Sequence, residues 1–279
     1  DGEVLRDVAV PSVGGSADGM TDRGVLSMEG IWDFAMTVEL DDVRDLLDRQ
    51  IACNGAIVDE GLAGDWGANI GSVMLGAYGD DVKVRACACA AAASDARMSG
   101  CELPVVINSG SGNQGITVTM PIVIYGRAWQ ADRELILRAL VLANLISVHQ
   151  KKYIGSLSAY CGATSAATGA ACGVAYMMLR QKGEQERIYQ ILCDTITNSI
   201  ETLGGMVCDG AKASCAAKIG LAVENALMAL ELSLAGNVFQ PGEGMTMEDP
   251  EDTIAAVGRM GRVGMKSTDV EILNIMLGN

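Results

Sequence analysis

The sequence predicts a mainly α-helical protein, a multi-helix domain of closely packed helices that are rich in small residues. Nearly half of its 279 residues, 49%, are apolar, yet only 4% are aromatic, and 34 are glycines. Helices that carry many small side chains can approach one another closely, so this composition favours tight helix packing. Apolar residues also recur at helical spacing from Ser27 onward. We therefore expect one helical domain over residues 27–279.

The composition also limits the partners that the protein can have. A net charge of −15 leaves few cations to neutralise phosphates, which argues against a nucleic-acid partner. No uninterrupted apolar run reaches the ~20 residues that cross a membrane, so we expect no membrane partner. The nine cysteines are odd in number and several lie in Ala- and Gly-rich stretches, which fits a reducing compartment better than a disulfide framework. We expect a cytoplasmic protein.

Residues 1–26 have a different pattern from the rest of the chain. DGEVLRDVAV, at residues 1–10, is typical of a short strand that follows an Asp-Gly turn, and PSVGGSADGMTDRG is a linker by composition. A single strand has no partner with which to pair. We expect residues 1–26 to be the remnant of an upstream domain, which is missing or on another chain, together with its linker.

The first helices are indicated by caps and by apolar spacing. Ser27 is placed to cap a short helix, and an acidic pair opens the next one. Residues 70–78 and 80–94 continue the pattern, the second almost entirely in small side chains. Cys87 and Cys89 are two residues apart, so they point to different faces of this helix and make a poor metal pair.

A glycine-rich loop precedes the most ambiguous segment of the chain. Residues 108–115, NSGSGNQG, expose backbone N–H groups and allow a ligand to approach closely. The following ITVTMPIVIY is typical of a strand by propensity, although Pro121 argues against a central strand. The alternative is a helix whose positive N-terminal end faces an anion at the loop. The Gly-x-Gly-x-x-Gly match in the loop lacks the strand–helix–strand context of a dinucleotide site.

Apolar and small-residue patterns predict helices through most of the remaining chain. These helices cover residues 131–150, 157–179, 185–203, 216–235, 250–258 and 268–277. RQKGEQER, at residues 180–187, is a surface loop by composition. His149 is the single histidine and lies near the end of a helix, where we expect a solvent-exposed residue rather than a catalyst.

Three cysteines in or beside small-residue turns are candidate metal ligands. Cys208 and Cys215 are seven residues apart in GGMVCDGAKASC, and Cys161 opens CGATSAATGAACG. Three thiolates brought together could hold an iron–sulfur cluster and leave one iron open for a substrate. The alternative is that these cysteines only fill space in the core, since Cys-x6-Cys matches no standard zinc or ferredoxin spacing. We expect the other six to be scattered through the packing: Cys53, Cys87, Cys89, Cys101, Cys172 and Cys193.

Three motifs are long enough to carry a family resemblance: AAASDARMSG, LPVVINSGSGNQGITVTMP and GGMVCDGAKASCAAK. They resemble the L-cysteine desulfidase family, which is related to the α-subunit of the iron–sulfur L-serine dehydratases. The likeness runs from about Ile31 to the C-terminus. Family members also carry an upstream half with a Gly-Cys-Thr-Glu-Pro motif, which this sequence lacks. The chain thus resembles the C-terminal two-thirds of a member, and the upstream half would lie in the same or another polypeptide.

The resemblance implies a lyase that eliminates the β-substituent of a small L-amino acid. L-Cysteine would give pyruvate, ammonia and sulfide, and dehydration of L-serine is the close alternative. Residues 27–279 would form the catalytic iron–sulfur domain, with a [4Fe–4S] cluster held by Cys161, Cys208 and Cys215. No residue is assigned as the base that takes the Cα proton, and a homo-oligomer is compatible with the sequence. The competing interpretation is a non-catalytic helical domain that needs an N-terminal partner.

The same resemblance implies a substrate-binding loop and supporting residues around the cluster. The loop residues are Asn108, Ser109, Ser111, Gly112, Asn113 and Gln114. Asp209, Ser214 and Lys218 are near enough in sequence to the ligands to tune the cluster, or else are ordinary turn and helix-start residues. We expect the loop to face the three cysteines across a cavity, because a substrate bound to the cluster must also reach the loop.

Overall fold

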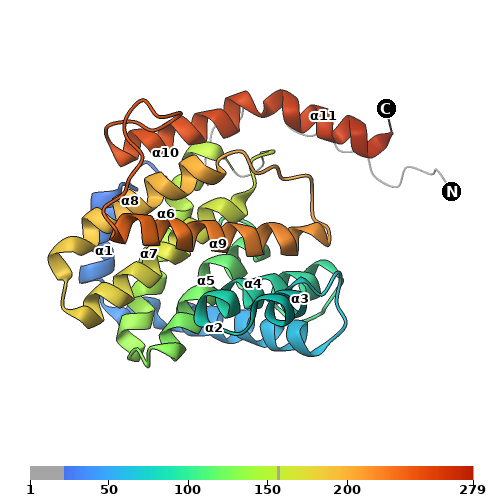
Figure 1. The fold of residues 1–279 in the computed structure, drawn as a ribbon, viewed down its shortest axis with the longest axis horizontal. Coiled ribbons are helices and arrows are strands. Elements are labelled where there is room, and N and C mark those ends of the chain that lie inside the picture. Colours follow the sequence, from blue (N-terminus) through green and yellow to red (C-terminus); the bar gives the residue numbers. More distant parts are fainter. Residues whose placement is uncertain (1–21, 156–157, 279) are drawn as a thin grey trace.

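The computed structural model describes residues 22–155 and 158–278, and every regular element in these residues is a helix (Figure 1). The prediction of a mainly α-helical protein is confirmed. The expected strand at residues 1–10 lies outside the described residues. The helices are, in chain order, α1 (Met28–Thr37), α2 (Leu40–Ala63), α3 (Ile70–Tyr78), α4 (Val82–Met98), α5 (Gly112–Ala128), α6 (Arg133–Ile154), α7 (Gly162–Lys182), the 3-10 turn η1 (Gln185–Arg187), α8 (Ile188–Leu203), α9 (Ser214–Leu234), α10 (Pro250–Arg259), the π turn η2 (Met260–Gly264) and α11 (Lys266–Leu277).

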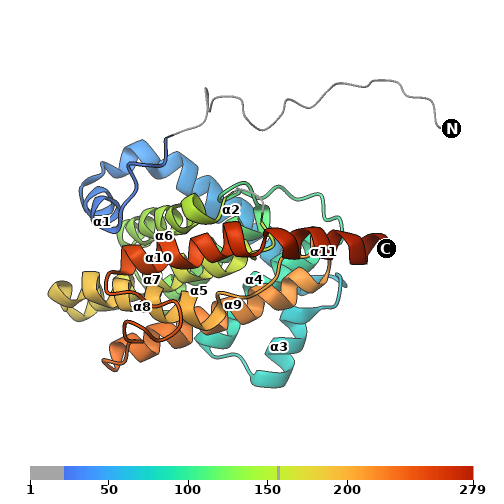
Figure 2. The same cartoon turned by 90° about the horizontal axis from the view of Figure 1, so that it is seen from above.

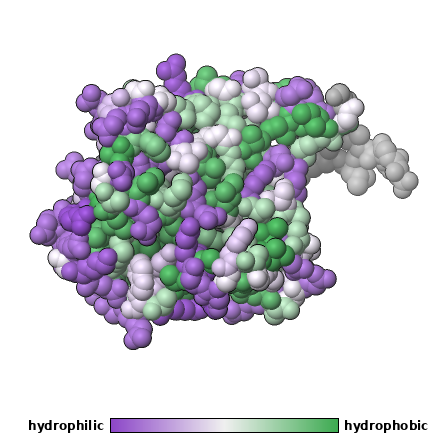
Figure 3. All heavy atoms as spheres, viewed as in Figure 1, coloured by the Kyte–Doolittle hydropathy of each residue, from purple (hydrophilic) through white to green (hydrophobic). Residues whose placement is uncertain are grey.

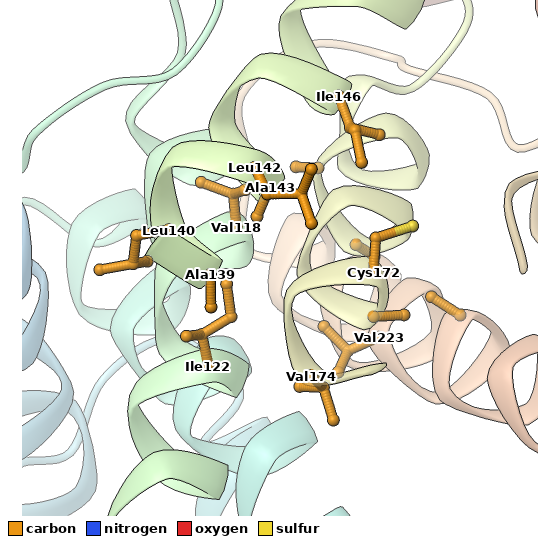
Figure 4. Packing of buried hydrophobic residues seen from close by; sticks show 14 of the residues in the cluster. Val118, Ile122, Ala139, Leu140, Leu142, Ala143, Ile146, Cys172, Val174 and Val223 are labelled. Atoms are coloured by element: carbon orange, nitrogen blue, oxygen red, sulfur yellow. The ribbon is translucent and has the colours of Figure 1, made fainter. Parts of the chain in front are cut away.

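Helix α7 lies at the centre of the fold and packs against α5, α6, α8 and α9. Figure 4 shows apolar side chains of α5, α6, α7 and α9 meeting in this core. The neighbouring backbones come very close. A Cβ added at Gly169 would lie 2.4 Å from the carbonyl oxygen of Ala143 in α6, and one at Gly173 would lie 3.0 Å from that of Ala139. The small residues of α7 are therefore what allows this contact.

Helix α4 is a second buried helix, and it packs against α2, α3, α5 and α9. Its residues from Ala86 to Ala96 are all buried. Two glycines let the crossing helices approach its backbone. A Cβ at Gly61 of α2 would lie 2.2 Å from the carbonyl oxygen of Ala92, and one at Gly71 of α3 would lie 2.4 Å from that of Ala88. Helices α2, α3 and α4 together form the lower right part of Figure 1.

The segment after the glycine-rich loop is helical, so the helical alternative is correct and the strand indicated by propensity is not formed. Helix α5 contains Pro121 in its interior. The side chain of Ser111 caps it by accepting a hydrogen bond from the backbone N–H of Gln114. Residues 114–126 are all buried, so the β-branched side chains pack on every face of the helix. Burial in the tertiary structure outweighs the small intrinsic preference for a strand.

Most other helix boundaries lie within a few residues of those expected. Ser27 caps α1 as predicted, because its hydroxyl accepts a hydrogen bond from the N–H of Gly30 at 3.1 Å. Helix α7 begins at Gly162, five residues later than predicted. The polar stretch at residues 180–187 is not a loop throughout, since its first three residues finish α7 and its last three form η1. Its side chains are nonetheless mostly exposed, which explains the composition.

His149 is fully buried, so the prediction of a solvent-exposed histidine is wrong. Its Nε2 lies 2.7 Å from Oε2 of Glu251 in α10, and the other carboxylate oxygen accepts a hydrogen bond from the N–H of Met28 in α1. Burial acts to raise the pKa of Glu251, but the hydrogen bonds from His149 and Met28 hold that pKa below its ordinary value. The pair joins α1, α6 and α10. Its members are 102 residues apart, beyond the reach of any local pattern.

Helix α11 is the least packed element. It extends from the end of α10 past the rest of the molecule, and none of its residues is buried (Figure 2). Figure 3 shows apolar side chains along it at the upper right, and Val270, Leu273 and Ile275 are 58%, 54% and 67% exposed. Despite this apolar surface, none of the helices in residues 22–155 and 158–278 is long and apolar enough to span a membrane.

Candidate functional site

A cavity of about 500 Å³ opens where three segments that are distant in sequence meet. One wall is the loop and first turn of α5, a second is the start of α7, and a third is the segment at residues 208–219 that leads into α9. Arg23, Arg97 and Lys151 are also part of its lining. The volume lies within the range of sites that bind small molecules.

Cys161, Cys208 and Cys215 all line this cavity. Backbone hydrogen bonds hold the first two segments side by side. The N–H of Cys161 donates to the carbonyl oxygen of Met206 at 2.9 Å, and the N–H of Cys208 donates to that of Ala159 at 2.6 Å. Cys215 is the second residue of α9. The structure thus brings these three thiols to one cavity, and the six remaining cysteines, all within the described residues, lie outside its lining.

The thiols of Cys161 and Cys208 are in hydrogen-bond contact, and this contact moves their pKa values in opposite directions. The S–H of Cys161 donates to the sulfur of Cys208, which lowers the pKa of Cys208 to about 6. The N–H of Gly210 and the ammonium of Lys218 act in the same direction. The same contact, together with burial, raises the pKa of Cys161. The cavity therefore favours the thiolate form of Cys208.

Lys218 stabilises the turn that carries Cys208. Its ammonium donates to the carbonyl oxygen of Val207 at 2.9 Å and pairs with the carboxylate of Asp209. The hydrogen bond from Lys218 lowers the pKa of Asp209. Of the expected supporting residues, Lys218 lines the cavity, whereas Asp209 and Ser214 do not. Asp209 thus acts on the site through Lys218, and Ser214 begins α9.

The loop before α5 forms another wall of the cavity. Asn108 and Ser111 exchange backbone hydrogen bonds of 3.1 and 3.0 Å. The two residues between them have positive φ, 48° at Ser109 and 82° at Gly110. This is the φ pattern of a type I′ turn, which glycine adopts without strain. The loop residues that line the cavity are Ser109, Gly110, Ser111, Asn113 and Gln114.

Asn108 and Gly112 do not line this cavity, in contrast to the rest of the expected substrate loop. Asn108 is 5% exposed. Its Nδ2 donates to Oδ1 of Asn144 at 2.9 Å, and its Oδ1 accepts a hydrogen bond from the hydroxyl of Ser147 at 2.9 Å. A Cβ at Gly112 would lie 2.4 Å from Nε of Arg97, so the glycine leaves room for that side chain. Both residues therefore support the loop without lining the cavity.

Arg97, Lys151 and Tyr160 line the cavity, although the sequence analysis did not single them out. Arg97 lies in the last turn of α4, and its Nη1 donates to Oδ1 of Asn113 at 3.3 Å. Lys151 lies in the last turn of α6 and is 3% exposed, and burial lowers its pKa. A lysine pair at a helix C-terminus is a common surface pattern, so no local signal separates Lys151 from its neighbour Lys152.

Helices α5, α7 and α9 all begin at this cavity. The partial positive charge of their N-termini adds to the charges of Arg97, Lys151 and Lys218. The cavity is therefore electropositive within a protein of net charge −15. Such surroundings favour thiolates and small anions.

Three thiols at one cavity are a donor set of the kind that holds an iron–sulfur cluster. In the described part of the chain, no group of three or more His, Cys, Asp or Glu side chains could hold one metal ion. Cys161, Cys208 and Cys215 supply three thiols to one cavity, and its positive surroundings would offset the negative charge of their thiolates.

The thiols and the polar loop lie within the part of the chain that matches a known family. Residues 17–274 match the family described as serine dehydratase alpha chain. The chain belongs to this family.

Curated relatives are similar to this chain over nearly its whole length. A UPF0597 protein of Lachnoclostridium phytofermentans is 50% identical over 260 residues, which cover 93% of this chain and 61% of that protein. A UPF0597 protein of Desulfitobacterium hafniense is 49% identical over 258 residues, which cover 92% and 58%. The chain thus spans about three fifths of the length of these curated relatives, whose names state no substrate. No solved structure matches the chain significantly.

Proposed function

We propose that the chain is the iron–sulfur part of a lyase that eliminates the β-substituent of a small L-amino acid. The preferred substrate is L-cysteine, which gives pyruvate, ammonia and sulfide, and dehydration of L-serine is the alternative. The observation that carries the proposal is the meeting of three thiols and a glycine-rich polar loop at one cavity. Membership of the serine dehydratase alpha chain family supports the reaction class, and the resemblance to the desulfidases supports L-cysteine.

The cofactor in this proposal is a [4Fe–4S] cluster held by Cys161, Cys208 and Cys215. Three protein ligands leave one iron open, and that iron would supply a Lewis acid for the carboxylate and the leaving group of the substrate. The shared cavity, the lowered pKa of Cys208 and the positive surroundings support this assignment. Lys218 and Asp209 would hold the turn around Cys208 in place through their ion pair.

The loop residues would bind and orient the amino acid. Ser109, Ser111, Asn113 and Gln114 offer hydroxyl and amide groups at the cavity wall. Helix α5 begins at this loop, so its N-terminus favours the negative charge that develops when the Cα proton leaves. Asn108 would keep this wall in position through its hydrogen bonds to α6. The size of the cavity suits a small substrate.

A further part of the enzyme would supply what this chain does not, because its relatives are longer. The matched residues cover 61% and 58% of two of them. In this proposal the further part lies in the same polypeptide or in a beta-type partner chain, and it carries the base that takes the Cα proton. A reducing compartment such as the cytoplasm suits the nine free cysteines.

Anaerobic reconstitution with iron and sulfide tests the cofactor. We expect a brown protein with a broad visible absorption band and about four irons per chain. Replacing Cys161, Cys208 or Cys215 by serine should lower the bound iron. Cys53→Ser and Cys101→Ser are matched controls, because both thiols are also half-buried but lie outside the cavity. A colourless wild-type protein, or equal iron loss in the controls, would favour the non-catalytic helical domain.

The products that the enzyme releases show whether its substrate is L-cysteine or L-serine. The reconstituted chain is supplied with L-cysteine or L-serine, alone and together with the upstream part of a longer relative. Sulfide and pyruvate released from L-cysteine with the higher kcat/KM would support the desulfidase reaction. Pyruvate released mainly from L-serine would establish the serine dehydratase alternative.

A further inference from the structure

Lys151 is a buried cation at the cavity whose charge has no acidic partner in the described part of the chain. It is 3% exposed and belongs to the cavity lining. None of the ion pairs within residues 22–155 and 158–278 involves it. Its neighbour Lys152, in contrast, donates to the carbonyl oxygen of Leu26. Among the described residues no carboxylate pairs with Lys151, and the thiols of Cys208 and Cys161 are the groups that favour its charge. A cation in this position can therefore also bind a small negatively charged ligand in the cavity.

Arg97 brings a second cation to the same cavity from α4. Its Nη1 donates to Oδ1 of Asn113 at 3.3 Å, which orients the guanidinium. Gly112 packs so closely that any side chain there would collide with Nε of Arg97. Like Lys151, Arg97 forms no ion pair with another described residue. A planar guanidinium binds a carboxylate through two parallel hydrogen bonds, so a free Arg97 matches that ligand group.

Three residues of the cavity lining carry a buried polar atom that lacks a hydrogen-bond partner among the described residues. These atoms are Oε1 of Gln114 and the hydroxyl oxygens of Ser109 and Tyr160. Gln114 is 8% exposed, and its amide lies against Gly162 at the start of α7. Buried polar atoms without partners are rare in folded proteins, so these three indicate a polar ligand. The amide oxygen of Gln114 can only accept, so it requires a donor group on that ligand. Arg97 and Lys151 can bind a carboxylate, and the free amide oxygen of Gln114 can accept a hydrogen bond from an ammonium group. Together they match a ligand that carries one carboxylate and one ammonium group.

We propose that Arg97 and Lys151 form a carboxylate subsite that binds the α-carboxylate of the substrate, while Gln114 accepts a hydrogen bond from its α-ammonium group. The inference rests on the proposed lyase function for the identity of the substrate, and it adds the residues that select it. A free α-carboxylate becomes a requirement for binding, so amides and esters of the same amino acid are rejected. Arg97 and Lys151 are specificity-determining residues in this assignment.

Calorimetric titration of the metal-free 279-residue chain with L-serine and with L-serinamide, which lacks the carboxylate, tests the subsite. The wild-type chain should bind L-serine more tightly than L-serinamide. Arg97→Gln and Lys151→Met should each weaken L-serine by about 10-fold to 100-fold, the effect of losing a hydrogen bond to a charged group. The affinity for L-serinamide should stay nearly unchanged in both variants.

Arg262→Gln and Lys266→Met are the matched controls. They remove the same two charges from exposed residues outside the cavity, so they should leave both affinities unchanged. Arg97→Lys and Lys151→Arg keep the charge and should recover part of the affinity for L-serine. Thermal unfolding of every variant checks the fold. If a neutral variant does not fold, the charge-preserving variants and the comparison of L-serine with L-serinamide still decide the question.

Three outcomes would overturn the subsite. A wild-type chain that binds L-serine no better than L-serinamide is one, and neutral variants that bind L-serine as tightly as wild type are another. The third is that both neutral variants lose reconstituted iron but bind L-serine as tightly as wild type. That result would mean that the two cations balance the charge of the cluster and do not bind the substrate. Failure of the subsite can be told apart from failure of the proposed lyase function. If the reconstituted chain binds L-serine through these residues but releases no pyruvate, the subsite is supported and the lyase function is not.

Discussion

The thiols of Cys161 and Cys208 act on each other's pKa values in opposite directions. The bridge between Tyr160 and Val207 brings the two cysteine-bearing segments together, and the thiol of Cys161 then donates to the sulfur of Cys208. The thiolate is the reactive form of cysteine and the form that binds metals. The lowered pKa of Cys208 therefore favours the form of this thiol that can bind a metal.

We expect Cys208 to be the first of the nine cysteines to react with iodoacetamide in the metal-free protein. Its pKa is lowered to about 6, so it is a protonated, slow thiol below that pH and a reactive thiolate above it. Cys172 and Cys193 should stay unmodified until the protein unfolds, because burial raises the pKa of both. Peptide mass spectrometry after short pulses between about pH 5 and pH 9 measures the rates.

Two substitutions at Cys161 test the cause of this reactivity. Cys161→Ala removes the donor, so the midpoint for Cys208 should move upward toward the ordinary value of 9.0. Cys161→Ser keeps a donor, so the midpoint should stay closer to that of wild type. A wild-type midpoint above about pH 8 would contradict the hydrogen-bonded pair.

Among the elements, the contact between α6 and α7 depends on glycine at the crossing point. Gly169 is buried, and the carbonyl oxygen of Ala143 occupies the space that a side chain would need. Backbone atoms cannot move aside as a flexible side chain can. The position therefore requires glycine, even though glycine is a poor helix former.

Gly169→Ala should lower the free energy of unfolding by roughly 1–3 kcal/mol, because the new methyl group overpacks the contact by more than the gain in helix propensity. Gly55→Ala in α2 is the matched control, since nothing lies within 4 Å of the Cβ position there. That control should raise the free energy of unfolding by roughly 0.5–1 kcal/mol. Urea denaturation measures both, and stabilisation by Gly169→Ala would show that the helices are not in close contact.

On the scale of the whole molecule, α10 is partly buried in the helical body, whereas α11 has no buried residue. Helix α10 buries Ile254 and Val257 and carries the carboxylate that binds His149. Helix α11 buries none of its residues and leaves several large apolar side chains in solvent. The two C-terminal helices should therefore contribute very differently to stability.

A chain that ends at Met265 lacks α11 and should unfold with a free energy within about 1 kcal/mol of wild type, because little buried surface is lost. It should also aggregate less, since exposed apolar patches promote association. A chain that ends at Asp249 lacks α10 as well and should lose more than about 3 kcal/mol, because buried aliphatic residues and the partner of His149 disappear. Urea denaturation and light scattering compare the two. A large loss on removing α11 alone would show that this helix packs on the body.

The helical class and most helix positions were predictable from the sequence alone. Helical periodicity, the Ser27 cap and the glycine- and alanine-rich composition are local properties, and local hydrogen bonds and side-chain spacing determine them. The three cysteines at the cavity were selected through motifs whose residues stand together in the sequence. The same holds for the polar loop at residues 108–115, where glycine content indicates a turn before the helix pattern begins.

The tertiary structure alone decided what those elements face. Helix α5 is helical because its β-branched residues are buried on every side, and propensity cannot report burial. His149 is buried because Glu251, 102 residues away, accepts its hydrogen bond. Lys151 looks like a surface lysine until α6 places it beside thiols from two other segments. Local patterns predicted most helix positions and the turn before α5, whereas the cavity depends on contacts between distant residues whose energies no local window contains.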